Sequence, residues 1–311
     1  MDQHKIDILI ATKVWNPTEW ADRLNQLESV GKVHIWPTED DLTNVKALFV
    51  WKPLDAHVLQ RLPHIEWVSS LGAGVDHLVG DHQIPDHIPI TRIVDPHLTR
   101  DMTNYVIMGL MMHQRSILQH LANQNQNIWD RLPYRNLQVG VLGLGELGAH
   151  CASHLAKLGF ITAGYSRTAK AIEGVQCYAE GQREEFLASL DVLVNLLPVT
   201  PQTDSILNTN LFSQMKDGAY LINVARGNHL VEEDLIIALN EEKISGALLD
   251  VFREEPLPSH HPLWNHPKVM VTPHVASVSL PESVMNLLEQ NINRLINGEE
   301  LLHKVDRKVG Y

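Results

Sequence analysis

The chain has 311 residues, of which 25 are basic and 37 acidic, so its formal net charge is −12. A surface of that sign repels nucleic acid and anionic lipid, and we therefore expect neither as a main partner. Its two cysteines lack the spacing of a zinc module or a disulfide framework. No apolar run approaches the roughly 18 residues that a membrane span needs. The run at residues 6–10 indicates a first strand rather than a signal peptide, so we expect a cytoplasmic protein of about two domains.

The first third of the chain alternates short apolar runs with amphipathic stretches, the pattern of a parallel α/β sheet. Apolar residues at helical spacing predict a helix over residues 17–30 that ends at Gly31. The stretch 99–126 is apolar along one face and lacks proline, so we predict one long helix there. Strands are expected at residues 6–11, 32–35, 47–50, 66–68 and 88–93.

A second alternating series begins at residue 138, and a last helix is predicted at 281–297. The layout predicts an α/β fold with two doubly wound parallel-sheet domains, the second inserted into the first. Spacing alone does not show that the C-terminus returns to the first domain. The second series consists of expected strands at 138–142, 161–165, 192–195, 219–223, 247–249 and 269–272, with helices between them, for example at 146–158 and 232–240.

A glycine-rich motif follows the strand expected at 138–142 and opens a helix. Its residues are Gly143, Leu144, Gly145, Glu146, Leu147 and Gly148. In such a turn the first glycine bends the chain, the second lets the backbone approach a pyrophosphate, and the third packs the helix against the strand. The helix N-terminus offers unpaired N–H groups and a partial positive charge to the phosphates. The motif in this context predicts a dinucleotide-binding Rossmann domain.

The end of the next strand indicates which dinucleotide binds. NAD-binding chains usually carry an acidic residue there, which accepts hydrogen bonds from the ribose 2′-OH. Here the chain reads Ser166, Arg167, Thr168, Ala169, Lys170, without a carboxylate. Arg167 and Lys170 are suited to a 2′-phosphate, although a solvated basic turn is the alternative. We therefore expect NADPH, with NADH as a weaker cofactor.

Three polar residues follow strands of the second series, where ligands bind in doubly wound sheets. Arg226 is suited to clamp a carboxylate, and a pair formed by Glu255 and His274 fixes the imidazole tautomer and favours its protonated form. Each residue alone is more often structural. Together they predict reduction of a 2-keto acid, in which a nicotinamide supplies hydride and His274 supplies the proton.

Two other features receive structural interpretations. His260, His261 and His266 alternate with prolines and lack a cysteine or acidic partner at ligand spacing, so we predict a loop and no metal site. Most of the tryptophans are expected in the core. Trp51 is the exception, because it ends an expected strand where a side chain can line a pocket.

These motifs resemble the D-2-hydroxyacid dehydrogenase family, and within it the bacterial A-type glyoxylate/hydroxypyruvate reductases. The closing residues 305–311 also resemble the end of the A-type group. The resemblance implies a flavodoxin-like substrate domain (1–98 plus 279–311), a Rossmann nucleotide domain (99–278), a cleft between them and a homodimer. The matching stretches run in family order at residues 71–76, 143–148, 195–198, 223–227, 249–252, 255–258 and 272–274.

The resemblance also implies residue roles. Arg226 would orient the substrate, Glu255 would pair with the histidine, and His274 would be the acid/base. The substrate contacts implied are Trp51, Leu71, Gly72, Ala73, Gly74 and Arg226, with backbone amides of Ala73 and Gly74 holding the carboxylate. The cofactor contacts implied are Met102, Gly143, Leu144, Gly145, Glu146, Leu147, Gly148, Ser166, Arg167, Thr168, Lys170, Leu197, Pro198, Thr203, Val224, Ala225, Asp250, His274, Ala276 and Ser277.

The chain departs from the family pattern in two places. Ser166 replaces a frequent aspartate, which supports NADPH. Met102, Thr103 and Asn104 stand where many members have Val-Ala-Glu, which weakens the expected nicotinamide contact of Met102. We expect reduction of glyoxylate to glycolate and of hydroxypyruvate to D-glycerate. The alternatives are a reductase of a bulkier 2-keto acid, such as phenylpyruvate, and a cofactor-sensing interaction protein of the same superfamily.

Overall fold

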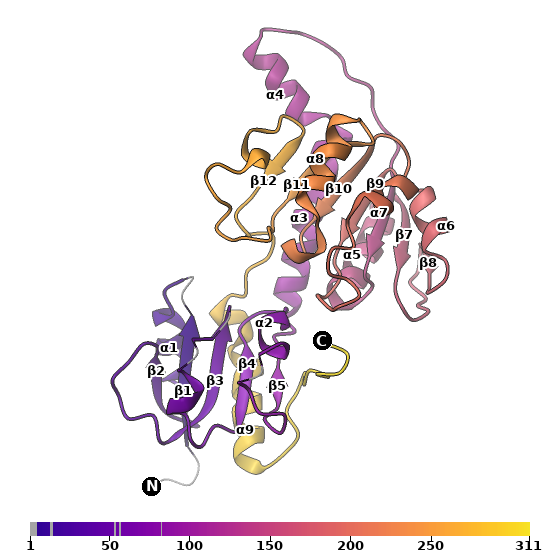
Figure 1. Ribbon diagram of the computed structural model, residues 1–311. Coiled ribbons are helices and arrows are strands. Elements are labelled where there is room, and N and C mark those ends of the chain that lie inside the picture. The colour runs from indigo at the N-terminus through magenta and orange to yellow at the C-terminus, as the bar shows by residue number, and fades with distance from the viewer. Residues whose placement is uncertain (1–4, 13–14, 53, 56, 82) are drawn as a thin grey trace. The chain divides into compact units, whose positions relative to one another are not determined.

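The computed structural model describes residues 5–12, 15–52, 54–55, 57–81 and 83–311 (Figure 1). The chain forms two compact units, Met1–Leu98 with Val278–Tyr311, and Thr99–Ser277. Within the described ranges, no helix is long and apolar enough to cross a membrane.

The described part of the first unit contains a five-stranded parallel sheet in the order β2-β1-β3-β4-β5. This is the flavodoxin-like order, as predicted. The helices of this unit are α1 (Thr18–Leu24), α2 (Asp76–Val79) and α9 (Pro281–Asn297), with a 3-10 turn at Leu59–Arg61. The strands are β1 (Ile6–Thr12), β2 (Val30–Ile35), β3 (Val45–Trp51), β4 (Trp67–Ser70) and β5 (Ile90–Thr91).

The C-terminal segment is part of the core of the first unit. Val284, Leu288 and Ile292 on one face of α9 are buried in the same cluster as apolar residues of β1 and β3. Beyond the helix, the chain returns to the sheet edge, where the Val305 N–H donates to the Ile90 carbonyl at 2.8 Å. The helix therefore closes one face of the sheet from the far end of the sequence.

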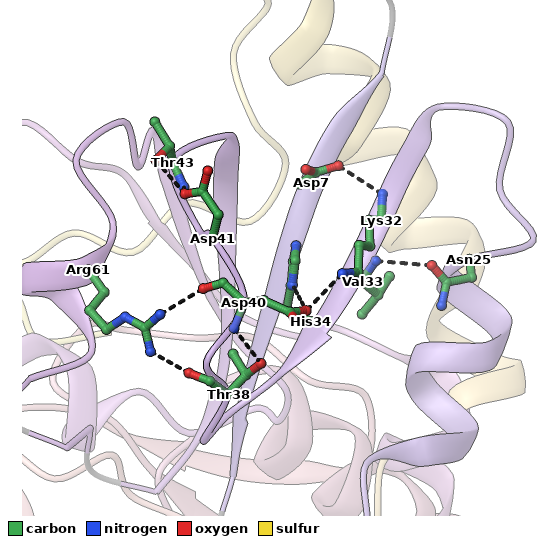
Figure 2. A network of polar contacts seen from close by, with 10 residues as sticks. All are labelled: Asp7, Asn25, Lys32, Val33, His34, Thr38, Asp40, Asp41, Thr43 and Arg61. Atoms are coloured by element: carbon green, nitrogen blue, oxygen red, sulfur yellow. Dashed lines mark hydrogen bonds and ion pairs between the residues drawn. The ribbon is translucent and has the colours of Figure 1, made fainter.

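Polar contacts fix the chain beyond β2 (Figure 2). The Asp40 carboxylate accepts hydrogen bonds from Lys32 Nζ and His34 Nδ1, each at 2.8 Å, and Arg61 donates to the Asp40 carbonyl at 2.7 Å. On the neighbouring strand, the Asp7 carboxylate accepts from the Lys32 N–H at 2.8 Å. The Lys32 hydrogen bond, and next that from His34, hold the pKa of Asp40 below its usual range.

The second unit, all of whose residues are described, contains a seven-stranded parallel sheet in the order β12-β11-β10-β9-β6-β7-β8. Apart from the extra strand β12, this is the Rossmann order, and it confirms the predicted fold class. The strands are β6 (Gln138–Leu142), β7 (Ile161–Tyr165), β8 (Val175–Tyr178), β9 (Val192–Asn195), β10 (Ala219–Asn223), β11 (Ile244–Leu249) and β12 (Val269–Val271).

The helices of the second unit connect its strands or precede them. The sequence predicted α5, α8 and six of the strands, but not β8, α6 or α7. The elements are α3 (Pro96–Gln114, whose first residues belong to the first unit), α4 (Ile117–Asn125), α5 (Glu146–Lys157), α6 (Arg183–Ala188), α7 (Thr209–Gln214) and α8 (Glu232–Asn240), with 3-10 turns at Gly227–His229 and Pro262–Asn265.

The structure corrects the prediction of one long helix at 99–126. Instead α3 ends at Gln114 and α4 begins at Ile117. Between them Ser116 adopts a left-handed backbone conformation with φ of 51°. That conformation interrupts the i to i−4 hydrogen bonds of a right-handed helix, so two helices replace one.

The helix predicted at 17–30 is also too long. α1 ends at Leu24, and the Asn25 side chain then accepts a hydrogen bond from the Val33 N–H at 3.0 Å. Gly31 therefore lies inside β2 instead of ending a helix. The strand predicted at 88–93 is reduced to Ile90–Thr91.

Candidate active site

His274 and Glu255 form a hydrogen-bonded pair. His274 Nδ1 lies 2.8 Å from Glu255 Oε2, and the two side chains are 24% and 20% exposed. The other carboxylate oxygen of Glu255 accepts from the Phe252 N–H at 3.1 Å. Because Nδ1 donates to the carboxylate, the pair fixes the tautomer and the orientation of the imidazole ring.

The backbone at His274 is held in a left-handed conformation with φ of 57°. Its N–H donates to the Asp250 carbonyl at 2.8 Å, directly after β11. The Asp250 side chain, only 1% exposed, accepts from the Val275 and Ala276 N–H groups, both at 2.9 Å. Both Asp250 oxygens thus hold the turn that presents His274, a function that sequence reasoning did not identify.

Arg226 follows β10 in extended backbone with φ of −148°. Its guanidinium donates to the Ala225 carbonyl at 2.7 Å. The next residue, Gly227, lies so close to the backbone of Phe252 that a Cβ at this position would overlap its carbonyl group. Since the Phe252 N–H also donates to Glu255, the Arg226 loop packs directly against the loop that carries Glu255.

A buried network links the ends of β9 and β10, and sequence reasoning missed it. Asn195, Asn223 and His229 are each 0% exposed. Asn195 Nδ2 lies 3.0 Å from both Asn223 Oδ1 and His229 Nδ1. Asn223 Nδ2 donates to the Arg226 carbonyl at 3.1 Å. The signal available in the sequence was an asparagine at the end of two successive strands.

The glycine-rich turn fits a dinucleotide. Gly143 has φ of 101°, which favours glycine, and a Cβ at Gly148 would overlap the Gly143 carbonyl. Gly145 has no atom within 4 Å of its Cβ position and precedes the first residue of α5. The helix therefore begins at a turn whose backbone is open to a phosphate group.

The turn after β7 has the basic character expected from the sequence. Ser166 Oγ donates to the Thr168 carbonyl at 2.7 Å, which folds the turn back on itself. Arg167, Thr168 and Lys170 are exposed, and residues 166–170 contain no carboxylate. The turn thus lacks the acidic partner of a ribose 2′-OH and carries two cations.

The predicted substrate contacts of the first unit follow β3 and β4. The Trp51 ring occupies the space where a Gly72 side chain would lie, so these two residues are in contact. Ser70 Oγ donates to the Gly74 carbonyl at 2.8 Å and accepts from the Gly72 N–H at 3.2 Å. Leu71 is buried, whereas Ala73 is not.

The remaining predicted cofactor positions lie in the second unit. Met102, Leu144, Val224 and Ala276 are buried in one apolar cluster. Thr203 Oγ1 donates to the Pro198 carbonyl at 2.7 Å and so closes the turn after β9. Four of the others lie in the glycine-rich turn or just after β9 and β10, namely Glu146, Leu147, Leu197 and Ala225. Ser277 lies in the segment between β12 and α9.

The histidine-rich stretch has more structure than predicted. Residues Pro262–Asn265 form a 3-10 turn, and His261 Nε2 lies 3.3 Å from a carboxylate oxygen of Glu232. Within the described ranges, no group of three or more His, Cys, Asp or Glu residues is placed to hold a metal ion.

The sheet orders, the glycine-rich turn and the hydrogen-bonded Glu255–His274 pair are those of a two-domain protein of the dinucleotide-dependent oxidoreductase class. The model of the D-isomer specific 2-hydroxyacid dehydrogenase NAD-binding domain matches residues 107–276. The chain belongs to the D-isomer-specific 2-hydroxyacid dehydrogenase family.

Relatives of known name agree over the full length. The chain is 37% identical to glyoxylate/hydroxypyruvate reductase A of Yersinia enterocolitica, over 98% of this chain and 100% of the relative. A 2-hydroxyacid dehydrogenase of Xanthobacter autotrophicus, solved with NADPH and MES, is 37% identical with a TM-score of 0.93, over 99% of this chain and 100% of that one. The NADPH-dependent glyoxylate/hydroxypyruvate reductase of Sinorhizobium meliloti, solved with NADP and sulfate, is 34% identical with a TM-score of 0.93 over the same shares.

Proposed function

We propose that this chain reduces small 2-keto acids with NADPH, converting glyoxylate to glycolate and hydroxypyruvate to D-glycerate. The observation that carries the proposal is the His274–Glu255 pair, 2.8 Å apart, in which the Glu255 loop packs against the loop of Arg226. A carboxylate clamp beside an oriented proton donor is the chemistry that reduction of a keto acid requires. Relatives named for this activity span the whole chain.

Each residue has a distinct role in this proposal. The Arg226 guanidinium binds the substrate carboxylate and polarises the neighbouring carbonyl group. His274 donates its proton to the carbonyl oxygen as that oxygen gains negative charge. Glu255 accepts the hydrogen bond from Nδ1 of His274 and so fixes the tautomer and the orientation of the ring. Within the first unit, the backbone N–H groups of Ala73 and Gly74 are the proposed carboxylate contacts, beside Gly72 on which Trp51 packs.

The second unit supplies the cofactor contacts. When bound, the nicotinamide supplies the hydride that reduces the carbonyl carbon. The backbone of the glycine-rich turn and the N-terminus of α5 bind the pyrophosphate, because their N–H groups and dipole favour anions. Arg167 and Lys170 bind the 2′-phosphate. Residues 1–98 and 279–311 act as the substrate domain and residues 99–278 as the nucleotide domain.

We further propose a cytoplasmic homodimer. The second unit leaves Met108 and Met111 of α3 and Leu118 and Leu121 of α4 between 36% and 51% exposed. An apolar surface of this kind on a helical segment favours burial against a second copy.

The proposal is tested by following NADPH oxidation at pH 7 with glyoxylate, hydroxypyruvate and phenylpyruvate in parallel. Fast turnover of the two small acids supports it. Turnover of phenylpyruvate alone would show that the enzyme reduces a bulkier 2-keto acid instead. Tight NADPH binding without turnover of any keto acid contradicts the reductase and favours a cofactor-sensing protein.

A further inference from the structure

The hydrogen bonds of the buried Asn195–Asn223–His229 network select one protonation state of His229. Asn195 Nδ2 carries two hydrogens and lies 3.0 Å from Asn223 Oδ1 and 3.0 Å from His229 Nδ1. It therefore donates one hydrogen to each. His229 Nδ1 must then be an acceptor, and the ring proton lies on Nε2, which donates to the Pro198 carbonyl at 3.2 Å.

The network joins the two loops that the proposed reaction uses. On one side, Asn195 Oδ1 accepts from the Leu197 N–H at 3.3 Å, and His229 holds the Pro198 carbonyl. These contacts fix the turn after β9, where cofactor contacts are expected. On the other side, Asn223 accepts from the Ala225 N–H at 3.4 Å and donates to the Arg226 carbonyl at 3.1 Å.

The contact with Asn195 requires neutral His229. A proton on Nδ1 would face the Asn195 amide group, also a donor, and the network would lose its acceptor. Each buried group left without a partner is costly, so an intact set of hydrogen bonds favours one arrangement of both loops over others.

We propose that Asn195, Asn223 and His229 are positioning residues that couple the turn after β9 to the Arg226 loop. His229 is the residue that is hydrogen-bonded toward both. This inference rests on the proposed function for the identity of the ligands. Through Pro198 the histidine sets the geometry of the cofactor turn. Through Asn195 and Asn223 it sets the geometry in which Arg226 meets a carboxylate.

Two conservative variants separate the two contacts. His229→Gln keeps a donor near the Nε2 position, and so the Pro198 bond, but removes the acceptor for Asn195. His229→Asn keeps an acceptor near the Nδ1 position but cannot reach Pro198. The matched control is His260→Asn, the same substitution at an exposed histidine of the same unit.

The experiment measures three quantities on the full chain: the Kd of NADPH, the Kd of oxalate in saturating NADPH, and Tm. Oxalate serves as a carboxylate probe that is not reduced. We expect His229→Asn to raise the NADPH Kd about tenfold and His229→Gln to raise the oxalate Kd about tenfold, since one lost hydrogen bond is worth about that factor. The other Kd of each variant, and both Kd values of the control, should stay within about twofold of the parent.

Two results would overturn the inference. In one, both variants lower Tm but bind both ligands like the parent, and the network then contributes to stability alone. In the other, both variants weaken the binding of both ligands equally, and His229 then does not act through two separate contacts. The inference and the proposed function fail separately, because the two Kd values do not depend on turnover. A parent that reduces no keto acid, but whose variants show the expected split, would refute the reductase and retain the positioning role.

Discussion

At His274 the backbone and the side chain are fixed by different neighbours. The left-handed backbone is held by the Asp250 carbonyl, and the ring is held by Glu255. The sequence pointed to Arg226, Glu255 and His274 as candidates because each follows a strand of a predicted parallel sheet, and the structure brings Glu255 and His274 together. It missed Asp250 as a support and the Asn195–Asn223–His229 network, because hydrogen bonds between strand ends depend on which strands are neighbours in space.

Replacement of the proposed proton donor is the most direct residue-level test. His274→Ala should lower kcat/KM for glyoxylate by about 10² to 10⁴, the usual contribution of a positioned general acid. NADPH affinity, from a binding titration, serves as the control and should change little. A kcat/KM within about threefold of the parent would show that another group donates the proton.

Cofactor selection is a separate residue-level prediction. Arg167→Ala should lower kcat/KM for NADPH by about 10- to 100-fold, because a charge-assisted hydrogen bond to the 2′-phosphate is worth about 1.5–3 kcal/mol. The value for NADH should stay unchanged, since NADH lacks that phosphate. Steady-state kinetics with both cofactors decides. An equal loss for both would remove Arg167 from cofactor selection.

Among the helices and strands, the periodicity of the sequence predicted the type of each element better than its first and last residues. The strands β6, β7, β9 and β10 and the helices α8 and α9 have the predicted bounds. The single helix at 99–126 was wrong, because its apolar pattern continues through Ser116 while the backbone does not. The strand β8 was missed, because Val175–Tyr178 is short and lies at a sheet edge, where alternation is weak.

The contact between α3 and β10 makes stability depend on pH. His113 stacks on Tyr220 with ring centroids 3.9 Å apart. Burial, and next the charge of Arg135, lower the pKa of His113 from 6.5 to about 4. In the unfolded chain this histidine regains its ordinary pKa, so between about pH 6.5 and 4 the unfolded state binds the extra proton. The free energy of unfolding therefore falls as pH falls through this range, by about 3 kcal/mol from this group.

His113→Phe removes the titrating group and keeps an aromatic ring against Tyr220. We expect its free energy of unfolding to fall less than that of the parent between pH 6.5 and pH 4.5. Urea unfolding of both proteins across that range measures the difference. Parallel pH profiles would show that His113 does not titrate in this way.

For the whole molecule, alternation and loop chemistry predicted two parallel-sheet domains, because parallel strands joined by helices permit few topologies. Only the resemblance to the family implied that the first of them is flavodoxin-like. Spacing did not predict that α9 packs in the first unit. That contact joins residues far apart in sequence, and only the resemblance to the family implied it. The same limit applies to oligomeric state, which depends on surfaces rather than on the order of elements.

The proposed homodimer predicts the effect of a charge on its apolar surface. Leu121→Glu places a carboxylate on a position of α4 that is 51% exposed. In a dimer buried there, the charge would be desolvated, so the variant should sediment as a monomer while the parent sediments as a dimer. Leu158→Glu, at a 54% exposed leucine after α5, is the control. A parent that is monomeric at micromolar concentration would contradict the dimer.

The proposed activity of this chain is the NADPH-dependent reduction of a small 2-keto acid. Its most direct measurement is the loss of absorbance at about 340 nm, where reduced nicotinamides absorb, with purified protein, glyoxylate and either NADPH or NADH. We expect rapid oxidation of NADPH and much slower oxidation of NADH, with one glycolate formed for each NADPH consumed. Equal rates would contradict the role of the Ser166–Lys170 turn, and no oxidation of either cofactor would contradict the reductase itself.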